Sequence, residues 1–164
     1  MKRRFAVVVM LAGFVGAGVA QGPAVKPNFA GTWKLNLAKS DLGQMAPTSE
    51  TDTITQTADV VKVTIAADRE QGKMTYSFPV KLDGTDTAVP ADAFPADSMF
   101  KLLNSKAEWV GSSLVITQTS SFQDAQGTLK STFTLSDDGK TLTKVVHFKF
   151  DQGEFDSKSV YDKA

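Results

Sequence analysis

Few side chains in this sequence are suited to acid–base, nucleophilic or metal chemistry. The chain has one histidine and no cysteine, which excludes disulfides, zinc–thiolate sites, iron–sulfur clusters and cysteine nucleophiles. His147 alternates out of phase with Leu142, Val146 and Phe148, so we expect its imidazole on the outer face of a strand. A Ser–His–Asp triad needs an oriented, partly buried imidazole, and the sequence has no G-x-S-x-G turn. We therefore expect a protein without catalytic residues.

The densest acidic group is Asp137-Asp138-Gly139. Asp and Gly are favoured in tight hairpin turns, which accounts for this group without a ligand. With one histidine and no cysteine, a metal site would need carboxylates alone. The sequence also lacks a glycine-rich phosphate loop and a dinucleotide fingerprint. We expect neither a metal nor a cofactor.

Strands must position the remaining candidates, because two-residue periodicity dominates the chain after residue 21. Residues 74–82 alternate apolar and polar side chains without a fault, and residues 61–65 do the same. The charged turn at 68–72 joins the two as a hairpin. Pro79 lacks a backbone N–H, which predicts an edge or a bulge at that position.

The second half of the chain repeats this pattern with short turns. Five further runs alternate in the same way, and their first apolar residues are Ala107, Leu114, Leu129, Leu142 and Phe155. About nine strands in a meander with one apolar face are expected to close, since closure removes exposed edges. We predict an all-β fold, a single up-and-down antiparallel barrel of about 8 to 10 strands. The connection 83–98 is either a lid over one mouth or a solvated link.

The predicted inner face mixes small polar residues with bulky apolar ones, among them Gln118, Ser120, Ser131, Ser157 and Ser159. A filled core would be bulky throughout, so this lining favours a cavity for a small amphipathic molecule. The alternative is an error of one residue in the register, or a bulge that inverts it. The candidate ligand-binding residues are Tyr161, Ser159, Tyr76, Gln118, Phe78, Phe133 and Phe148.

Residues 1–20 have the pattern of a secretory signal peptide. Three basic residues precede an apolar run from Phe5 to Val19 that is too short to span a bilayer, and small residues end the run at Ala20. Removing three of the 18 basic residues leaves 15 against 18 acidic ones, which disfavours nucleic acid and anionic membranes as partners. We expect export to the periplasm or medium, a flexible segment at 21–27, a barrel domain at 28–164, and no membrane insertion after cleavage.

The segment Phe29–Leu35 (FAGTWKL) resembles the F-x-G-x-W-K-L start of intracellular fatty-acid-binding proteins and the G-x-W signature of the wider lipocalin-like (calycin) superfamily. The resemblance implies a barrel whose closed end is plugged by Trp33, next to the phenylalanine that opens the segment. Gly31 then leaves room where the strand bends. Lys158 or Lys163 is expected across the Trp33 ring.

The segment Val160–Lys163 is similar to the last strand of fatty-acid-binding proteins. Those proteins carry a basic residue two positions before the tyrosine, and the pair holds the ligand carboxylate; here that position is Ser159. Burying an anion without a charged donor is costly. We therefore expect any ligand to be neutral and mostly apolar, oriented by the Tyr161 hydroxyl and its serine neighbours.

Two departures separate the chain from fatty-acid-binding proteins. Residues 37–49 leave little room for their helical lid, although Leu37–Met45 could form one or two turns, and those proteins are cytosolic. A closer likeness is to small exported bacterial lipocalin-like proteins. These share the G-T-W-K-L-N start, a K-S pair as at 39–40, an L-S-x-D-G-K-T-L-T hairpin as at 135–143, and a G-E-F strand as at 153–155.

We therefore expect an exported, non-enzymatic protein that holds a small apolar or amphipathic, neutral molecule inside its barrel. The alternative is a protein-interaction or inhibitor module that uses the barrel as a scaffold for loops such as 83–98. A bound small molecule would distinguish the first class from the second.

The leader pattern predicts where the mature chain begins. We expect exported protein to start within a few residues of Gln21, because signal peptides are cleaved after small residues. N-terminal sequencing and intact mass of protein recovered from the envelope or medium will test this. Recovery of the chain with Met1 intact would contradict it.

Overall fold

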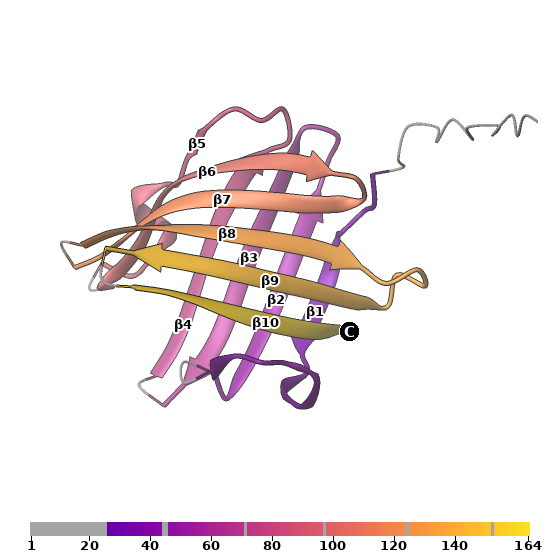
Figure 1. The fold of residues 1–164 in the computed structure, drawn as a ribbon, viewed down its shortest axis with the longest axis horizontal. Coiled ribbons are helices and arrows are strands. Elements are labelled where there is room, and N and C mark those ends of the chain that lie inside the picture. The colour runs from indigo at the N-terminus through magenta and orange to yellow at the C-terminus, as the bar shows by residue number, and fades with distance from the viewer. Residues whose placement is uncertain (1–25, 44–45, 71, 97, 124, 152) are drawn as a thin grey trace, which may run out of the picture.

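The computed structural model describes residues 26–164 except positions 44–45, 71, 97, 124 and 152 (Figure 1). The predicted leader therefore lies outside the described residues. Within them the chain forms ten strands and two single-turn 3-10 helices, and no helix there is long and apolar enough to cross a membrane. The elements are β1 (Gly31–Leu35), η1 (Leu37–Lys39), β2 (Ser49–Gln56), β3 (Val60–Arg69), β4 (Gly72–Lys81), β5 (Thr87–Ala88), η3 (Ala91–Ala93), β6 (Phe100–Val110), β7 (Ser113–Phe122), β8 (Ala125–Leu135), β9 (Thr141–Phe150) and β10 (Gly153–Lys163).

All ten strands belong to one antiparallel sheet that curves into a nearly closed barrel. The sheet order is β4-β3-β2-β1-β10-β9-β8-β7-β6-β5, so the first strand pairs with the last and most others pair with their sequence neighbours. Figure 1 shows β1 to β4 behind β6 to β10, and the two sets of strands cross at a steep angle. The predicted all-β, up-and-down barrel is confirmed.

The barrel closes through side chains where β4 and β5 form the two ends of the sheet order. The Ser105 hydroxyl donates to the Pro79 carbonyl at 3.1 Å, and the Lys81 N–H donates to the Thr87 hydroxyl at 3.1 Å. Pro79 is paired in the ladder with Lys62 of β3. Its predicted edge position is confirmed, because β4 is a terminal strand of the sheet.

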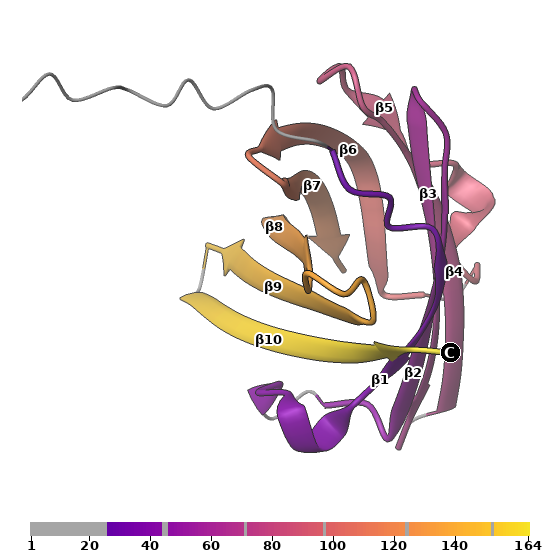
Figure 2. The ribbon, with the colours of Figure 1, turned by 90° about the vertical axis from the view of Figure 1, so that its right-hand side faces the viewer.

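The connection 83–98 covers this seam. β5 pairs with β6, and the Val89 N–H donates to the Leu103 carbonyl at 3.0 Å. Val89 and Phe94 are both buried, and the Phe94 ring stacks on Tyr76 with 4.7 Å between centroids. Figure 2 shows β5 and the following helical turn beside β3 and β4. The connection is therefore part of the barrel wall.

Alternation along the strands places one face of each long strand inside the barrel. In β3 the residues Val61, Val63 and Ile65 are buried, and in β4 the residues Phe78 and Val80 are buried, as predicted. The register pairs Val63 with Phe78 and Val61 with Val80 across the two strands. Burial of each such side chain contributes roughly 1.5 to 3 kcal/mol, so this face holds the sheet in its curved form.

Trp33 fills one end of the barrel, which agrees with the plug implied by the resemblance. Its ring is fully buried, and Nε1 donates to the Phe29 carbonyl at 2.9 Å. Gly31 has a φ of +148°, and a Cβ there would lie 3.3 Å from Cε of Lys163. The Lys163 ammonium lies 5.3 Å from the centre of the Trp33 ring, so the predicted cation across the ring is Lys163.

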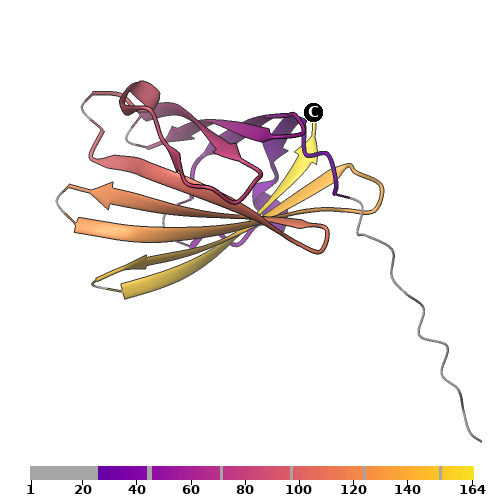
Figure 3. The same ribbon diagram turned by 90° about the horizontal axis from the view of Figure 1, so that it is seen from above.

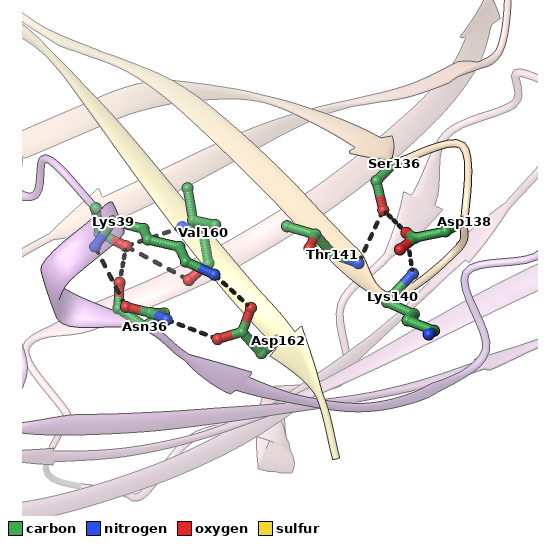
Figure 4. Close-up of polar contacts among 9 residues, drawn as sticks. Asn36, Lys39, Ser136, Asp138, Lys140, Thr141, Val160 and Asp162 are labelled. Atoms are coloured by element: carbon green, nitrogen blue, oxygen red, sulfur yellow. Dashed lines mark hydrogen bonds and ion pairs between the residues drawn. The ribbon is translucent and has the colours of Figure 1, made fainter.

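Two local networks of polar contacts hold the chain outside the core (Figure 4). The Asn36 amide and the Lys39 ammonium both donate to Asp162 of β10, at 2.6 and 3.1 Å, and they lower the pKa of that carboxyl. In the β8–β9 turn, Asp138 accepts hydrogen bonds from the Ser136 hydroxyl and the Lys140 N–H. The interpretation of the acidic group at 137–139 as turn chemistry is thereby confirmed.

Replacing Trp33 by alanine is expected to lower the free energy of unfolding by about 3 to 5 kcal/mol, as large-to-small core changes do. Urea denaturation will measure this. Val110→Ala is a matched control at an exposed position of β6 and is expected to stay within about 0.5 kcal/mol of the wild type. An unchanged denaturation midpoint for Trp33→Ala would contradict the plug.

Candidate ligand-binding site

A small cavity lies inside the barrel. Its volume is about 70 Å³, and four polar side chains line it: Tyr76, Gln118, Ser131 and Lys144. That space holds about two water molecules, whereas pockets for whole small molecules measure roughly 300 to 1,000 Å³. The apolar part of the lining consists of Ile65, Phe78, Phe100, Leu102, Leu129, Phe133 and Val146.

Gln118 brings an unpartnered hydrogen-bond donor to this cavity. Its side chain is buried, and Nε2 has no hydrogen-bond partner among the described residues. Ser120, the next inward residue of β7, is also buried, and its hydroxyl likewise has no hydrogen-bond partner among the described residues. Buried polar groups are nearly always hydrogen-bonded. The cavity therefore has one donor, the Gln118 amide, that a ligand or ordered water can satisfy.

Aromatic side chains continue from the cavity to the open end of the barrel. The Phe100 ring lines the cavity and lies 6.4 Å from Phe148. Phe148 in turn lies 4.2 Å from Phe150 and 5.0 Å from Phe155, measured between ring centroids. Phe122 of β7 is opposite Phe100 in the register. We call these five residues the mouth cluster.

The mouth cluster leaves apolar surface open to solvent. Phe122 and Phe155 follow the inward alternation of their strands, yet they are 43% and 45% exposed. Figure 3 shows that β6 to β10 diverge from β1 to β4 toward the ends of the strands that carry these residues. Inward-facing aromatic residues are normally covered by core packing. This end of the barrel therefore leaves aromatic side chains of the inward face open to solvent.

Gly127 of β8 shapes the wall of the mouth. A Cβ at this position would lie 2.6 Å from the Phe150 ring, closer than side chains can approach. The ring therefore lies directly over the β8 backbone. Next to it, a larger hollow of about 410 Å³ is lined by Thr128, Lys149, Asp151 and neighbouring residues. That hollow has a mixed polar and apolar lining and is open to solvent, whereas the interior cavity is mainly apolar and more enclosed, so the interior is the better candidate for an apolar ligand.

A charged cluster spans the interior beside the cavity. The Lys144 ammonium of β9 lies 2.9 Å from Oδ2 of Asp52 and 3.1 Å from Oε1 of Glu50, both on β2. The Tyr161 hydroxyl of β10 donates to the same Glu50 oxygen at 2.5 Å. Lys144 also lies 4.8 Å from the centre of the Tyr161 ring. All four side chains are buried or nearly so.

Burial and pairing move the pKa values of this cluster in different directions. Burial raises the pKa of Asp52 to about 6, with Lys144 opposing and Glu50 reinforcing the shift. Burial also acts upward on Glu50, but the Lys144 ammonium and the Tyr161 hydrogen bond outweigh it, so the Glu50 pKa is lowered. The carboxylates together hold the pKa of Lys144 above its ordinary value despite burial. Lys144 is therefore charged at neutral pH.

The structure brings together some of the residues predicted from the sequence and places others elsewhere. Tyr76, Gln118, Phe78 and Phe133 line the cavity, and Phe148 belongs to the mouth cluster. Ser159 is buried on the inward face of β10 but is not among the cavity-lining residues.

Tyr161 is also outside that lining, and its hydroxyl donates to Glu50. His147 is on the outer face as expected, 43% exposed and 2.7 Å from an Asp156 oxygen.

Sequence reasoning missed Glu50, Asp52 and Lys144. Lys144 occupies the inward phase between Leu142 and Val146, so alternation alone contained the signal. This inward ammonium comes from β9 and not from the last strand, where the sequence has Ser159 two positions before the tyrosine. Its presence nevertheless means that the interior is not lined by hydroxyls alone.

No protein-family model matches the chain, and no curated protein is significantly similar to it. In the described part of the chain, no group of three or more His, Asp or Glu side chains is arranged to hold a metal ion. The fold and the interior thus define a nearly closed antiparallel β-barrel with a small, mainly apolar cavity that carries a few polar side chains, behind an aromatic mouth.

The raised pKa of Asp52 predicts the pH dependence of stability. The folded protein binds this proton more tightly than the unfolded chain, so the stabilisation present at low pH is lost as pH rises through about 6. Asp52→Asn removes that titration. Its free energy of unfolding relative to wild type should increase by about 1 kcal/mol between pH 5 and pH 7.5.

Urea denaturation at the two pH values gives this difference directly. Asp137→Asn, in the exposed β8–β9 turn, is the matched control and should follow the wild type at both pH values. A difference that stays flat or shrinks as pH rises would show that Asp52 is ionised without cost in the fold.

Proposed function

We propose that this chain is an exported, non-enzymatic binding protein that holds a small, neutral, mostly apolar amphiphile in its barrel. The observation that carries the proposal is the mouth cluster, in which inward-facing Phe122 and Phe155 are close to half exposed. Soluble proteins seldom leave clustered aromatic side chains exposed unless something binds there. The likeness of residues 29–35 to lipocalin-like proteins is in keeping with this role.

The two parts of the interior suit the two ends of an amphiphile. The cavity of about 70 Å³ fits a small polar head, which Gln118, Tyr76 and Ser131 would bind. The Phe100–Phe148–Phe155 ring contacts lead from that cavity to the mouth, where an apolar tail would lie. The ligand would thus enter with its polar end first.

The charges inside the barrel favour a neutral head group. Glu50 and Asp52 face Lys144, and the Arg69 guanidinium also acts on Glu50. Two acids and two bases cancel at neutral pH. A ligand carboxylate would therefore find no uncompensated cation, and burying it would be costly.

The alternative of an interaction module rests on the connection 83–98. Its apolar side chains Val89 and Phe94 are buried against the barrel. The connection therefore seals the seam where β4 meets β5 and β6, and this role in the barrel wall accounts for its buried side chains. A barrel that binds no amphiphile would favour the alternative.

The proposal predicts that 1-decanol binds with one site per chain and that Phe155→Ser weakens binding about tenfold, equivalent to 1.4 kcal/mol. The lost contact is apolar burial against the tail. Displacement of a fluorescent fatty alcohol will measure both affinities. Native mass spectrometry of protein from an exporting host will show whether a small molecule is retained.

Val110→Ser serves as the matched control, because Val110 is 59% exposed at the opposite end of β6. It should leave decanol binding unchanged. Equal weakening by both variants, or no binding by the wild type, would contradict an interior site.

A further inference from the structure

We propose that the barrel accepts anionic amphiphiles in acid and excludes them at neutral pH, because a proton taken up at Asp52 leaves Lys144 with Glu50 as its one ionised partner and gives the interior beside the cavity a net positive charge. The inference rests on the proposed binding of amphiphiles inside the barrel. It adds a second ligand class to that site and states when the site admits it.

Lys144 connects the charged cluster to the ligand cavity. Among the described lysines and arginines, it is the one that lines this cavity. On its other side, its ammonium contacts Glu50 at 3.1 Å and Asp52 at 2.9 Å. An anionic head group in the cavity would therefore compete with two carboxylates for one ammonium.

The Asp52 carboxyl has a place for a proton that leaves this contact intact. Its Oδ2 accepts from Lys144, whereas Oδ1 is buried and has no hydrogen-bond partner among the described residues. A proton on Oδ1 would remove the negative charge without displacing the lysine. Glu50 differs, because its Oε1 accepts hydrogen bonds from both Lys144 and Tyr161. The proton therefore goes to Asp52.

The charged and titratable groups around Asp52 come from five strands. Glu50 lies on the same strand, with Lys144 on β9 and Tyr161 on β10. Arg69 of β3 acts on Glu50, and Tyr76 of β4 is partly buried near the same charges; its burial raises its pKa. Both tyrosines are neutral at the pH values of interest.

Protonation of Asp52 changes the charge of the interior from balanced to positive. Its pKa of about 6 places the change between neutral and mildly acidic pH. Above that pH, two carboxylates offset Lys144 and Arg69. Below it, one positive charge is left in a region of low dielectric, where it attracts an anion more strongly than in water.

Decyl sulfonate and 1-decanol are the matched probes, because the sulfonate stays charged from pH 5 to pH 7.5 and the alcohol stays neutral. Each is titrated below its micellar concentration. We expect the sulfonate Kd to rise about 30-fold from pH 5 to pH 7.5, with a limiting slope of about tenfold per pH unit. The decanol Kd should be the same at both pH values.

Two variants locate the effect. Asp52→Asn has no carboxyl to ionise, so at pH 7.5 it should bind the sulfonate about as tightly as wild type does at pH 5. Glu50→Gln should do the same, and it provides a second test if the first variant folds poorly by near-UV circular dichroism. Lys130→Met, on an exposed position of β8, is the control and should keep the wild-type pH profile.

The outcomes separate this inference from the proposed function. Decanol binding at both pH values, with sulfonate affinity that is absent or independent of pH, would overturn the switch and leave the proposed function in place. Failure of both probes at both pH values would overturn the two together. A sulfonate profile that persists unchanged in Asp52→Asn and Glu50→Gln would show that another group controls it.

Discussion

One buried ammonium shared by two carboxylates constrains the interior of this barrel. Removing a charge from water costs several kcal/mol unless partners compensate for it, and Lys144 meets this requirement with Glu50 and Asp52. The partners come from β2 and β9, which are separated in the sheet by β1 and β10. The cluster therefore forms only when the sheet has the curvature and register of the closed barrel. Tyr161, which bonds to Glu50, adds β10 to the same constraint.

The two ends of the barrel are packed differently. At one end, Trp33, Phe29 and Trp109 fill the interior, with the Phe29 and Trp109 rings 6.0 Å apart. At the other end, the aromatic rings touch one another without covering the opening. Core packing at the closed end supplies stability. The other end can therefore leave aromatic side chains uncovered without loss of the core.

Alternation in the sequence predicts most of this architecture and little of its polar chemistry. The inward residues of β3 and β4 and the edge position of Pro79 follow from local patterns, whereas the plug at Trp33 follows from the resemblance of residues 29–35 to lipocalin-like proteins. The strand Ser49–Gln56 does not, because its inward positions Glu50 and Asp52 break the apolar pattern. Lys144 finds its partner Asp52 at a separation of 92 residues, which no local pattern records. Alternation predicts which face of the sheet a side chain is on but not how deeply it is buried. The exposure of the mouth cluster therefore could not be predicted from the sequence.

Within the described residues, the seam where β4 meets β5 and β6 is the one junction of the barrel wall that is not closed by a backbone ladder. The hydrogen bonds described there are made by side chains of Ser105 and Thr87, each contributing about 1 kcal/mol. Every other junction between strands is a backbone ladder, in which separation breaks a row of bonds at once. Parting at the seam would widen the barrel while leaving all ladders paired. Parting there would also disturb the buried Val89 and Phe94, and it would change the internal volume of the barrel while leaving its topology unchanged.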